Sequence, residues 1–160
     1  MNTAELEETL WQDPKVRSML GGVFPCDRLP NKILSSKRIF IANTHPASRK
    51  GEHWVAFYFP PQGKCIYFDS FGLPPIIPSF VDFMEKNAKN WTYNSKRLQD
   101  FNSNVCGHYC LLFAYYMARR KPLHQMLKLF DKRTHINDKK VVDFLNIIYP
   151  AGKQRRLRKK

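Results

Sequence analysis

The sequence lacks the patterns that would place it in a membrane, a fibre or a disulfide scaffold. No apolar run approaches the ~20 residues of a membrane span, and residues 1–10 are acidic and polar, unlike a secretory signal. Glycine is scarce, at 7 residues, and no heptads occur, which excludes collagen and coiled coils. Four cysteines without a C-x-x-C pair favour neither a disulfide framework nor a metal site.

Acidic residues are also scarce. The chain of 160 residues carries 13 Asp and Glu against 27 Lys and Arg, which gives a net charge of +14. Such a surface attracts polyanions, nucleic acid above all. Hydrophobic residues make up 43% and aromatic residues 14% of the chain, so it can fold around a core. We expect one domain over residues 1–150 that works near nucleic acid.

The remaining residues, 151–160, predict a disordered basic tail with six Lys or Arg and no acid. Electrostatic binding to DNA would use the side chains of Lys153, Arg155, Arg156, Arg158, Lys159 and Lys160. A nuclear address and a merely solvated end are alternative interpretations of the same residues.

Hydrophobic patterning predicts an α+β fold with a mixed central sheet. We expect two short N-terminal helices, the second ending at Gly21–Gly22, and then an extended loop over 23–37. Strands are predicted at 38–43, 53–59, 64–69 and, near an edge, 91–98. Helices are predicted at 79–89, 105–120, 123–130 and 138–148, and the expected N-caps are Thr3, Ser79 and Asn137.

Cys106 is the first candidate for chemistry, because it opens the long apolar helix soon after the potential capping residues 102–104. The positive end of a helix dipole stabilises a thiolate. Free backbone N–H groups there can hold a developing oxyanion, and Gly107 leaves room for a substrate backbone. The alternative is a buried, inert thiol, which is what we expect for Cys65 and Cys110.

A cysteine nucleophile needs a base, and His53 begins the first strand of the predicted hairpin. If the turn at 60–63 sets His53 opposite Ser70 and Asp69 opposite Trp54, the carboxylate falls ~5–8 Å from the imidazole. Asp69 could then hold one ring nitrogen while the other takes the thiol proton. Alone, His53 would be a solvated strand-end residue. The other histidines are expected on the surface or in packing roles: His45, His108, His124 and His135.

Gln99 lies seven residues before Cys106, in the loop that leads to the helix. Its side-chain amide could donate to the same oxyanion as the Cys106 N–H group. Without other support, a solvated loop glutamine would be the simpler interpretation.

Three segments, taken in order, resemble the adenovirus-type cysteine endopeptidases, which are related to the SUMO and ubiquitin-like proteases. Gly51–Phe57 matches the family's Gly-x-His-Trp-x-Ala-Phe strand, and Tyr67–Gly72 matches its acid followed by x-Phe-Gly. Gln99 with Cys106–Cys110 matches its Gln…Cys-Gly-x-Phe/Tyr-Cys pattern. The resemblance implies a papain-like, adenain-like fold of the α+β class, with a buried helix that starts at the nucleophile.

The resemblance also implies the roles of the residues in a thiol protease. His53 would be the base, Asp69 its orienting acid, Cys106 the nucleophile and Gln99 an oxyanion donor. Substrate contacts are expected from Trp54 and Gly107. Adenovirus-type enzymes cut precursor proteins at Gly-containing sites during virion maturation, with DNA as an activator.

We therefore expect a monomeric viral endopeptidase of the host nucleus and the virion, from an adenovirus-related virus or a virus-like mobile element. It would act on viral precursor proteins, with DNA as a partner, no membrane and no tightly bound cofactor. Adenovirus enzymes bond an activating viral peptide through a cysteine before the Gln strand, and residues 90–96 contain none. An activating peptide would therefore need another anchor.

Two other functions remain open. The same site and a Gly-Gly preference would also suit a deubiquitinase or deSUMOylase-type isopeptidase, which is one alternative. In a departure from the adenovirus pattern, the acid is Asp69, as in SUMO proteases, where adenovirus enzymes have Glu. A non-enzymatic nucleic-acid-binding or packaging protein is the other, and it would use only the charge and the tail.

Overall fold

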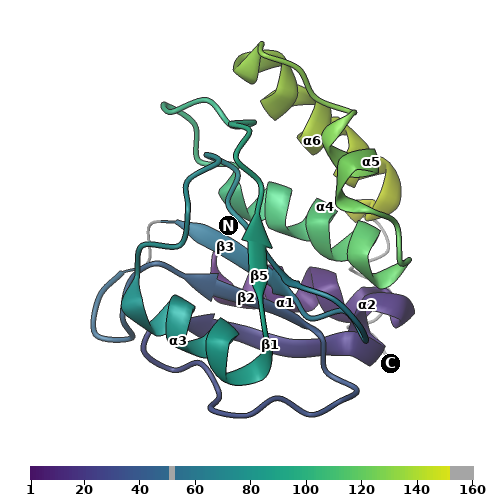
Figure 1. The fold of residues 1–160 in the computed structure, drawn as a ribbon. Helices are drawn as coiled ribbons and strands as arrows, with labels where there is room; N and C mark the ends of the chain where they lie inside the picture. The colour runs from purple at the N-terminus through teal and green to yellow at the C-terminus, as the bar shows by residue number, and fades with distance from the viewer. Residues whose placement is uncertain (51–52, 152–160) are drawn as a thin grey trace.

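A mixed five-stranded sheet with the order β1-β2-β3-β4-β5 forms the centre of the fold (Figure 1). The computed structural model describes residues 1–50 and 53–151. Its strands are β1 (Leu20–Pro25), β2 (Ile39–Asn43), β3 (Trp54–Tyr58), β4 (Cys65–Phe68) and β5 (Trp91–Tyr93). The three middle strands pair antiparallel, whereas β1 and β5 run parallel to their neighbours at the two edges. The predicted mixed sheet is confirmed, and β5 lies at the predicted edge but is shorter than expected.

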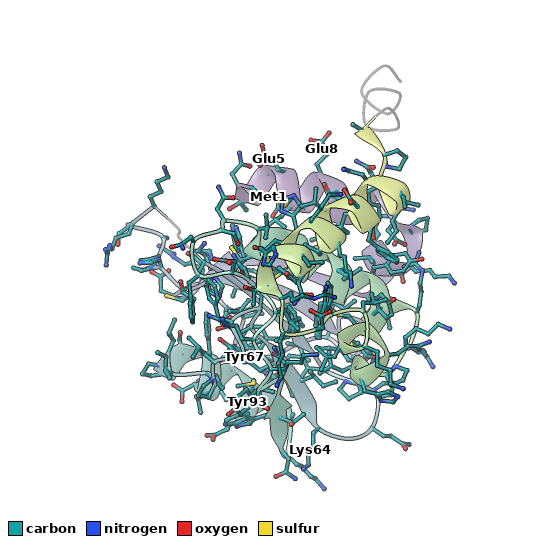
Figure 2. The ribbon with its side chains drawn as sticks, turned by 90° about the horizontal axis from the view of Figure 1, so that it is seen from above. Met1, Glu5, Glu8, Lys64, Tyr67 and Tyr93 are labelled. Atoms are coloured by element: carbon teal, nitrogen blue, oxygen red, sulfur yellow. The ribbon has the colours of Figure 1, made fainter. Side chains whose placement is uncertain are left out.

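Helices cover both faces of this sheet (Figure 1). They are α1 (Thr3–Gln12), α2 (Pro14–Met19), α3 (Pro78–Asn87), α4 (Cys106–Ala118), α5 (Leu123–Leu127) and α6 (Thr134–Ile148). α3 packs on one face, and α4 packs on the other with the remaining helices around it. Seen from above, α1 with Met1, Glu5 and Glu8 lies across the molecule from Lys64 and Tyr93 (Figure 2). Within the described residues, none of the helices has the length and apolarity to cross a bilayer.

Alternating side chains of the central strands supply two separate cores. In β2, Ile39 and Ile41 pack toward α4, whereas Phe40 and Ala42 pack toward α3. All five residues of β2 and all five of β3 are buried. This explains why both strands are continuous apolar runs in the sequence. The sheet therefore carries one apolar core on each face.

α4 is apolar around nearly its whole circumference, and ten of its 13 residues are buried. A helix of this kind must lie inside a protein rather than on its surface. It packs mainly against β3 and α6. The predicted buried helix that begins at Cys106 is therefore confirmed.

The prediction that Gly21–Gly22 ends a helix is wrong, because both glycines lie within β1. A Cβ on Gly21 would come within 2.1 Å of the Phe40 ring, so the missing side chain lets β1 lie beside β2. The register shifts between Leu20 and Gly22, and Gly22 has a φ of +145°. Gly21 and Gly22 therefore belong to an irregular edge strand. In a sequence, two adjacent glycines are compatible with such a strand as well as with the end of a helix.

The predicted N-caps of α1 and α3 are also wrong. Asn2 rather than Thr3 caps α1, in a capping box with Glu5. α3 begins at Pro78, a residue suited to the first position of a helix. Ser79 therefore lies inside the helix, and no side chain caps it.

The last helix, α6, starts one turn earlier than expected, at Thr134, so Asn137 is not its cap. Asn137 is completely buried. Its side-chain amide donates to the carbonyl of Leu98 at 3.1 Å and to that of Asp131 at 2.8 Å. It thus fastens α6 to the loop that precedes α4. The tail, apart from Ala151, lies outside the described residues, and its six basic side chains stay a prediction.

Candidate active site

Three predicted site residues from distant parts of the chain meet at the start of α4. His53 directly precedes β3 and Asp69 directly follows β4, and their side chains are 2.9 Å apart between Nε2 and Oδ1. The Cys106 thiol lies beside the same imidazole, close enough for each group to shift the pKa of the other. Because Nε2 is engaged by Asp69, Nδ1 is the nitrogen left for the thiol. The order is carboxylate, imidazole, thiol.

The register of the β3–β4 hairpin differs from the predicted one by one residue. Ala56 pairs with Phe68 and Phe57 pairs with Tyr67, and the same register continued to the strand ends sets His53 opposite Phe71 instead of Ser70. Asp69 nevertheless reaches the imidazole, because it lies in the turn that leaves β4. The predicted pairing of His53 with Asp69 is thus present, but its local geometry comes from this turn.

The electrostatic environment favours a charged thiolate–imidazolium pair. Burial alone would lower the pKa of His53, but its hydrogen bonds with Asp69, whose carboxylate accepts, and with Cys106, together with the charges of these two groups, raise it to about 9. Burial likewise would raise the pKa of Cys106, yet the hydrogen bond to His53, the backbone N–H of Trp54 and the imidazolium charge bring it below its ordinary value. Each group therefore stabilises the reactive form of the other.

The backbone of Asp69 is fixed by a residue that the sequence did not single out. Asn94, which follows β5, accepts from the Asp69 N–H at 3.0 Å and donates to the Asp69 carbonyl at 2.6 Å. Both residues are buried. One amide side chain thereby replaces a missing strand partner and ends the pairing of β5 after Tyr93. Nothing in the local sequence distinguishes Asn94 from an ordinary loop asparagine.

The N-terminus of α4 has no side-chain cap. Val105 occupies the N-cap position without a capping hydrogen bond, so the expected capping by residues 102–104 does not occur. Asp100 instead organises that loop, since it accepts from the N–H of Asn102 at 3.0 Å. The first-turn N–H groups of α4 are consequently not taken by a capping side chain.

Gln99 is not the solvated loop residue of the simpler interpretation, because it is only 1% exposed. Its Oε1 accepts from the Ser70 hydroxyl at 2.6 Å. Its Nε2 donates toward the carbonyl and the hydroxyl of Ser103, both at 3.1 Å. The amide is therefore held between the loops that carry Ser70 and Ser103, and its role as an oxyanion donor stays a prediction.

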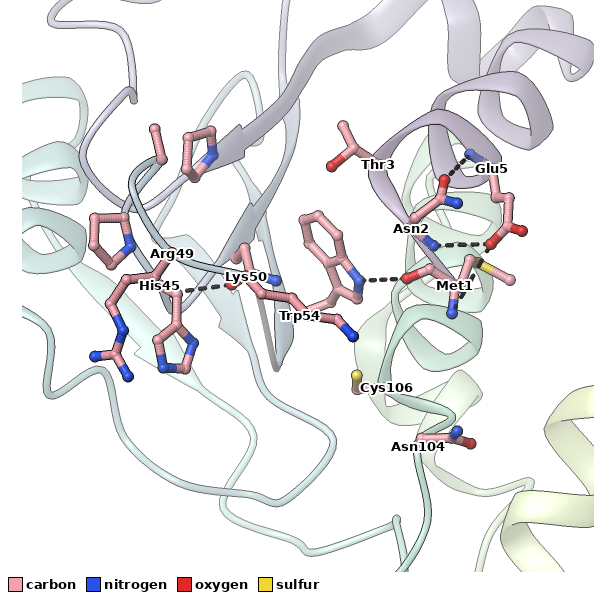
Figure 3. A pocket seen from close by; sticks show the side chains of 14 residues that line it. Met1, Asn2, Thr3, Glu5, His45, Arg49, Lys50, Trp54, Asn104 and Cys106 are labelled. Atoms are coloured by element: carbon pink, nitrogen blue, oxygen red, sulfur yellow. Dashed lines mark hydrogen bonds and ion pairs between the residues drawn. The ribbon is translucent and has the colours of Figure 1, made fainter.

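A cleft of about 740 Å³ opens beside Cys106 (Figure 3). One wall is the start of α1, including Met1, and the other is the loop with Arg49 and Lys50. Trp54 lies in the cleft between them, and its indole Nε1 donates to the Met1 carbonyl at 3.1 Å. Cys106, although only 6% exposed, is among the residues that line this cleft.

Both predicted substrate-binding residues, Trp54 and Gly107, lie next to this thiol but are covered in part by Met1. A Cβ on Gly107 would meet the Met1 side chain at 3.2 Å and the Trp54 ring at 3.4 Å. The missing side chain lets Met1 and Trp54 pack closely at this point. Contact of either residue with a substrate stays a prediction.

The other cysteines are buried and distinct from Cys106 in their electrostatics. All four cysteines are free. Burial raises the pKa of Cys65 and of Cys110, as expected for inert thiols. Within residues 1–50 and 53–151, no group of three His, Cys, Asp or Glu side chains could hold a metal ion.

No protein-family profile matches the chain. No curated protein matches it in sequence. Among solved structures, the chain is similar to a crystal structure of the selenomethionine ASFV pS273R protease, with a TM-score of 0.48 and 18% identity. The match covers 66% of this chain and 43% of the other. The chain thus spans less than half the length of that protein.

Proposed function

We propose that this chain is a thiol protease with Cys106 as nucleophile, His53 as base and Asp69 as orienting acid. The observation that carries the proposal is the contact series from Asp69 through His53 to Cys106 at an uncapped helix start, open to a cleft. Each contact has a chemical consequence that cysteine catalysis needs. A cluster of side chains with a purely structural role would need neither a lowered Cys106 pKa nor a cleft beside the thiol.

The first half of the reaction forms an acyl-enzyme. The Cys106 thiolate attacks the peptide carbonyl carbon, and the carbonyl oxygen becomes an oxyanion beside the first-turn N–H groups of α4. The His53 imidazolium then gives its proton to the amide nitrogen as the C–N bond breaks. Asp69 keeps the imidazole oriented throughout, because its Oδ1 holds Nε2.

The second half releases the acid product. Neutral His53 accepts a proton from water, and the resulting hydroxide attacks the thioester carbonyl. The C–S bond breaks, and the thiolate–imidazolium pair is restored. No oxidant or metal takes part in this balance.

The finer assignment rests on the motif resemblance and the charge of the chain. We propose precursor structural proteins as substrates, cleaved at Gly-containing sites during virion maturation in the host nucleus. DNA is the proposed activator, because the net charge of +14 favours polyanion contact. The basic tail would contribute to that contact, so removal of residues 152–160 should weaken the DNA response and leave the basal rate unchanged.

The test is hydrolysis of a Gly-containing peptide by the wild-type chain and by Cys106→Ala, with and without DNA. Hydrolysis should need Cys106, rise with DNA and fall again as salt screens the contacts. Equal rates for the two proteins would overturn the protease proposal, and a flat response to DNA would remove only the activator. A ubiquitin or SUMO vinyl sulfone that labels Cys106 would instead favour the isopeptidase alternative.

A further inference from the structure

The aromatic ring of Phe71 lies flat against the imidazole of His53. The ring centroids are 4.8 Å apart and the planes differ by 22°. Phe71 is the phenylalanine of the acid-x-Phe-Gly segment, but none of the catalytic roles proposed above falls on it. Stacking leaves the two ring nitrogens of His53 free, so it does not compete with Asp69 or Cys106.

The backbone of Phe71 is tied to the same carboxylate oxygen as the imidazole. Asp69 Oδ1 accepts from Phe71 N–H at 2.8 Å and from His53 Nε2 at 2.9 Å. One atom therefore fixes both stacked partners. A rotation of the carboxylate would disturb the base and its stacking ring together.

A tight turn holds Phe71 in this position. The N–H of Gly72 donates to the Asp69 carbonyl at 2.8 Å, and Gly72 has a φ of +71°. A Cβ on Gly72 would lie 2.7 Å from the Lys96 carbonyl carbon, which leaves no room for another residue. The turn is further pinned because the Ser70 carbonyl accepts from the N–H of Leu98 at 2.9 Å.

Two more side chains support Phe71 from outside. Phe101 packs on it at 5.6 Å between centroids, and the Arg97 guanidinium lies 4.0 Å over the Phe101 ring. Phe101 is 67% exposed, an unusual amount for a phenylalanine that serves only the core. The stack thus runs outward from His53 through two aromatic rings to a cation.

We propose that Phe71 is a positioning residue for His53, supported by Phe101, and that it keeps the base aligned between Asp69 and Cys106. The role depends on the proposed function of His53. The stacked ring restricts rotation of the imidazole and excludes water from one of its faces. Its π-face also favours the charged imidazolium over the neutral ring.

Two titratable groups among the described residues act on the His53 imidazole. They are the Asp69 carboxylate from the end of β4 and the Cys106 thiol from α4. Arg97 is separated from the imidazole by the two rings. A change at Phe71 should therefore act on the thiolate–imidazolium pair without altering a neighbouring charge.

The experiment measures the pH dependence of Cys106 alkylation by iodoacetamide, and it titrates the His53 ring by NMR. Neither measurement needs a peptide substrate, so the result stays separate from the failure of protease activity. Phe71→Leu should slow alkylation at pH 7 by about 3- to 10-fold, the range that aromatic and cation–π contacts span. It should also lower the His53 pKa, whereas Phe71→Tyr should restore both values.

Leu73→Ala is the matched control, because Leu73 belongs to the same loop, is 51% exposed and makes no ring contact with His53. It should leave alkylation and the His53 titration unchanged. Phe101→Leu removes an exposed ring, which keeps folding intact, and should move both readouts in the same direction by less. The proposal would be overturned if folded Phe71→Leu alkylated at the wild-type rate and kept the wild-type His53 titration. If Phe71→Leu does not fold, the same result in Phe101→Leu would overturn it.

Discussion

The first and second turns of α4 place the same residue type in opposite chemical environments. Cys106 meets an imidazole, backbone N–H groups and an open cleft, and its pKa is lowered. Cys110, one turn later, is 1% exposed within the core, and burial raises its pKa well above normal. The difference teaches that the reactivity of a cysteine here is set by its position along one helix, since the two residues are only one turn apart.

The largest expected effect that tests this comparison is the loss of the Cys106 thiol. Cys106→Ala should lower peptide hydrolysis by about 10⁴- to 10⁶-fold, because the members of such a unit act together. Cys110→Ala should keep a rate close to that of the wild type. Steady-state hydrolysis at matched protein concentration measures both. A comparable loss in the two variants would mean that the turns do not differ in function.

The next effect concerns the carboxylate that aligns the base. Asp69→Asn keeps the shape of the side chain but removes its charge, so hydrolysis should fall by about 10²- to 10⁴-fold. The Cys106 thiol, in the first turn of α4, should then react more like that of an ordinary cysteine. The control is Asp82→Asn, a change on α3 away from the cleft, which should leave the rate unchanged. A wild-type rate in Asp69→Asn would assign the alignment of His53 to other contacts.

The pH dependence of thiol alkylation separates the two cysteines without any substrate. The Cys106 pKa is lowered and the His53 pKa is raised to about 9, so the reactive pair exists between the two values. Alkylation of Cys106 should accordingly begin below the pH at which a free cysteine reacts. His53→Gln should move the onset upward, because burial then acts on the thiol without its cationic partner. An onset that does not move would contradict the pairing.

The sequence was sufficient to predict the parts of the site that depend on local patterns. His53 precedes the first strand of one hairpin and Asp69 follows its second strand, so the hairpin brings them to the same end. Cys106 begins a helix that is apolar on all sides. The positions of all three residues follow from short-range periodicity. The mixed sheet followed from the same runs. The resemblance of three ordered motifs then connected these separate pieces.

Other features could not be predicted, because they depend on contacts between distant segments. Asn94 holds Asp69 across 25 residues, and the stack of Phe71 on His53 depends on a register one residue away from the predicted one. The glycines of β1 were misjudged because the Phe40 ring that fills their place lies on another strand. Side-chain bridges of this kind leave no periodic trace in the sequence.

A substitution in the second turn of α4 should have the smallest effect on the rate of hydrolysis and a clear effect on stability. Cys110→Ser places a hydroxyl in a fully buried apolar site and should lower the free energy of unfolding by about 1–3 kcal/mol. Because Cys110 touches the core and not the cleft, the rate of the folded protein should stay close to wild type. Denaturant unfolding with a parallel rate measurement checks both. Cys110→Ala, which adds no polar atom, is the matched control. A loss of rate without a loss of stability would show that the second turn takes part in the reaction, and the comparison between the two turns would fail.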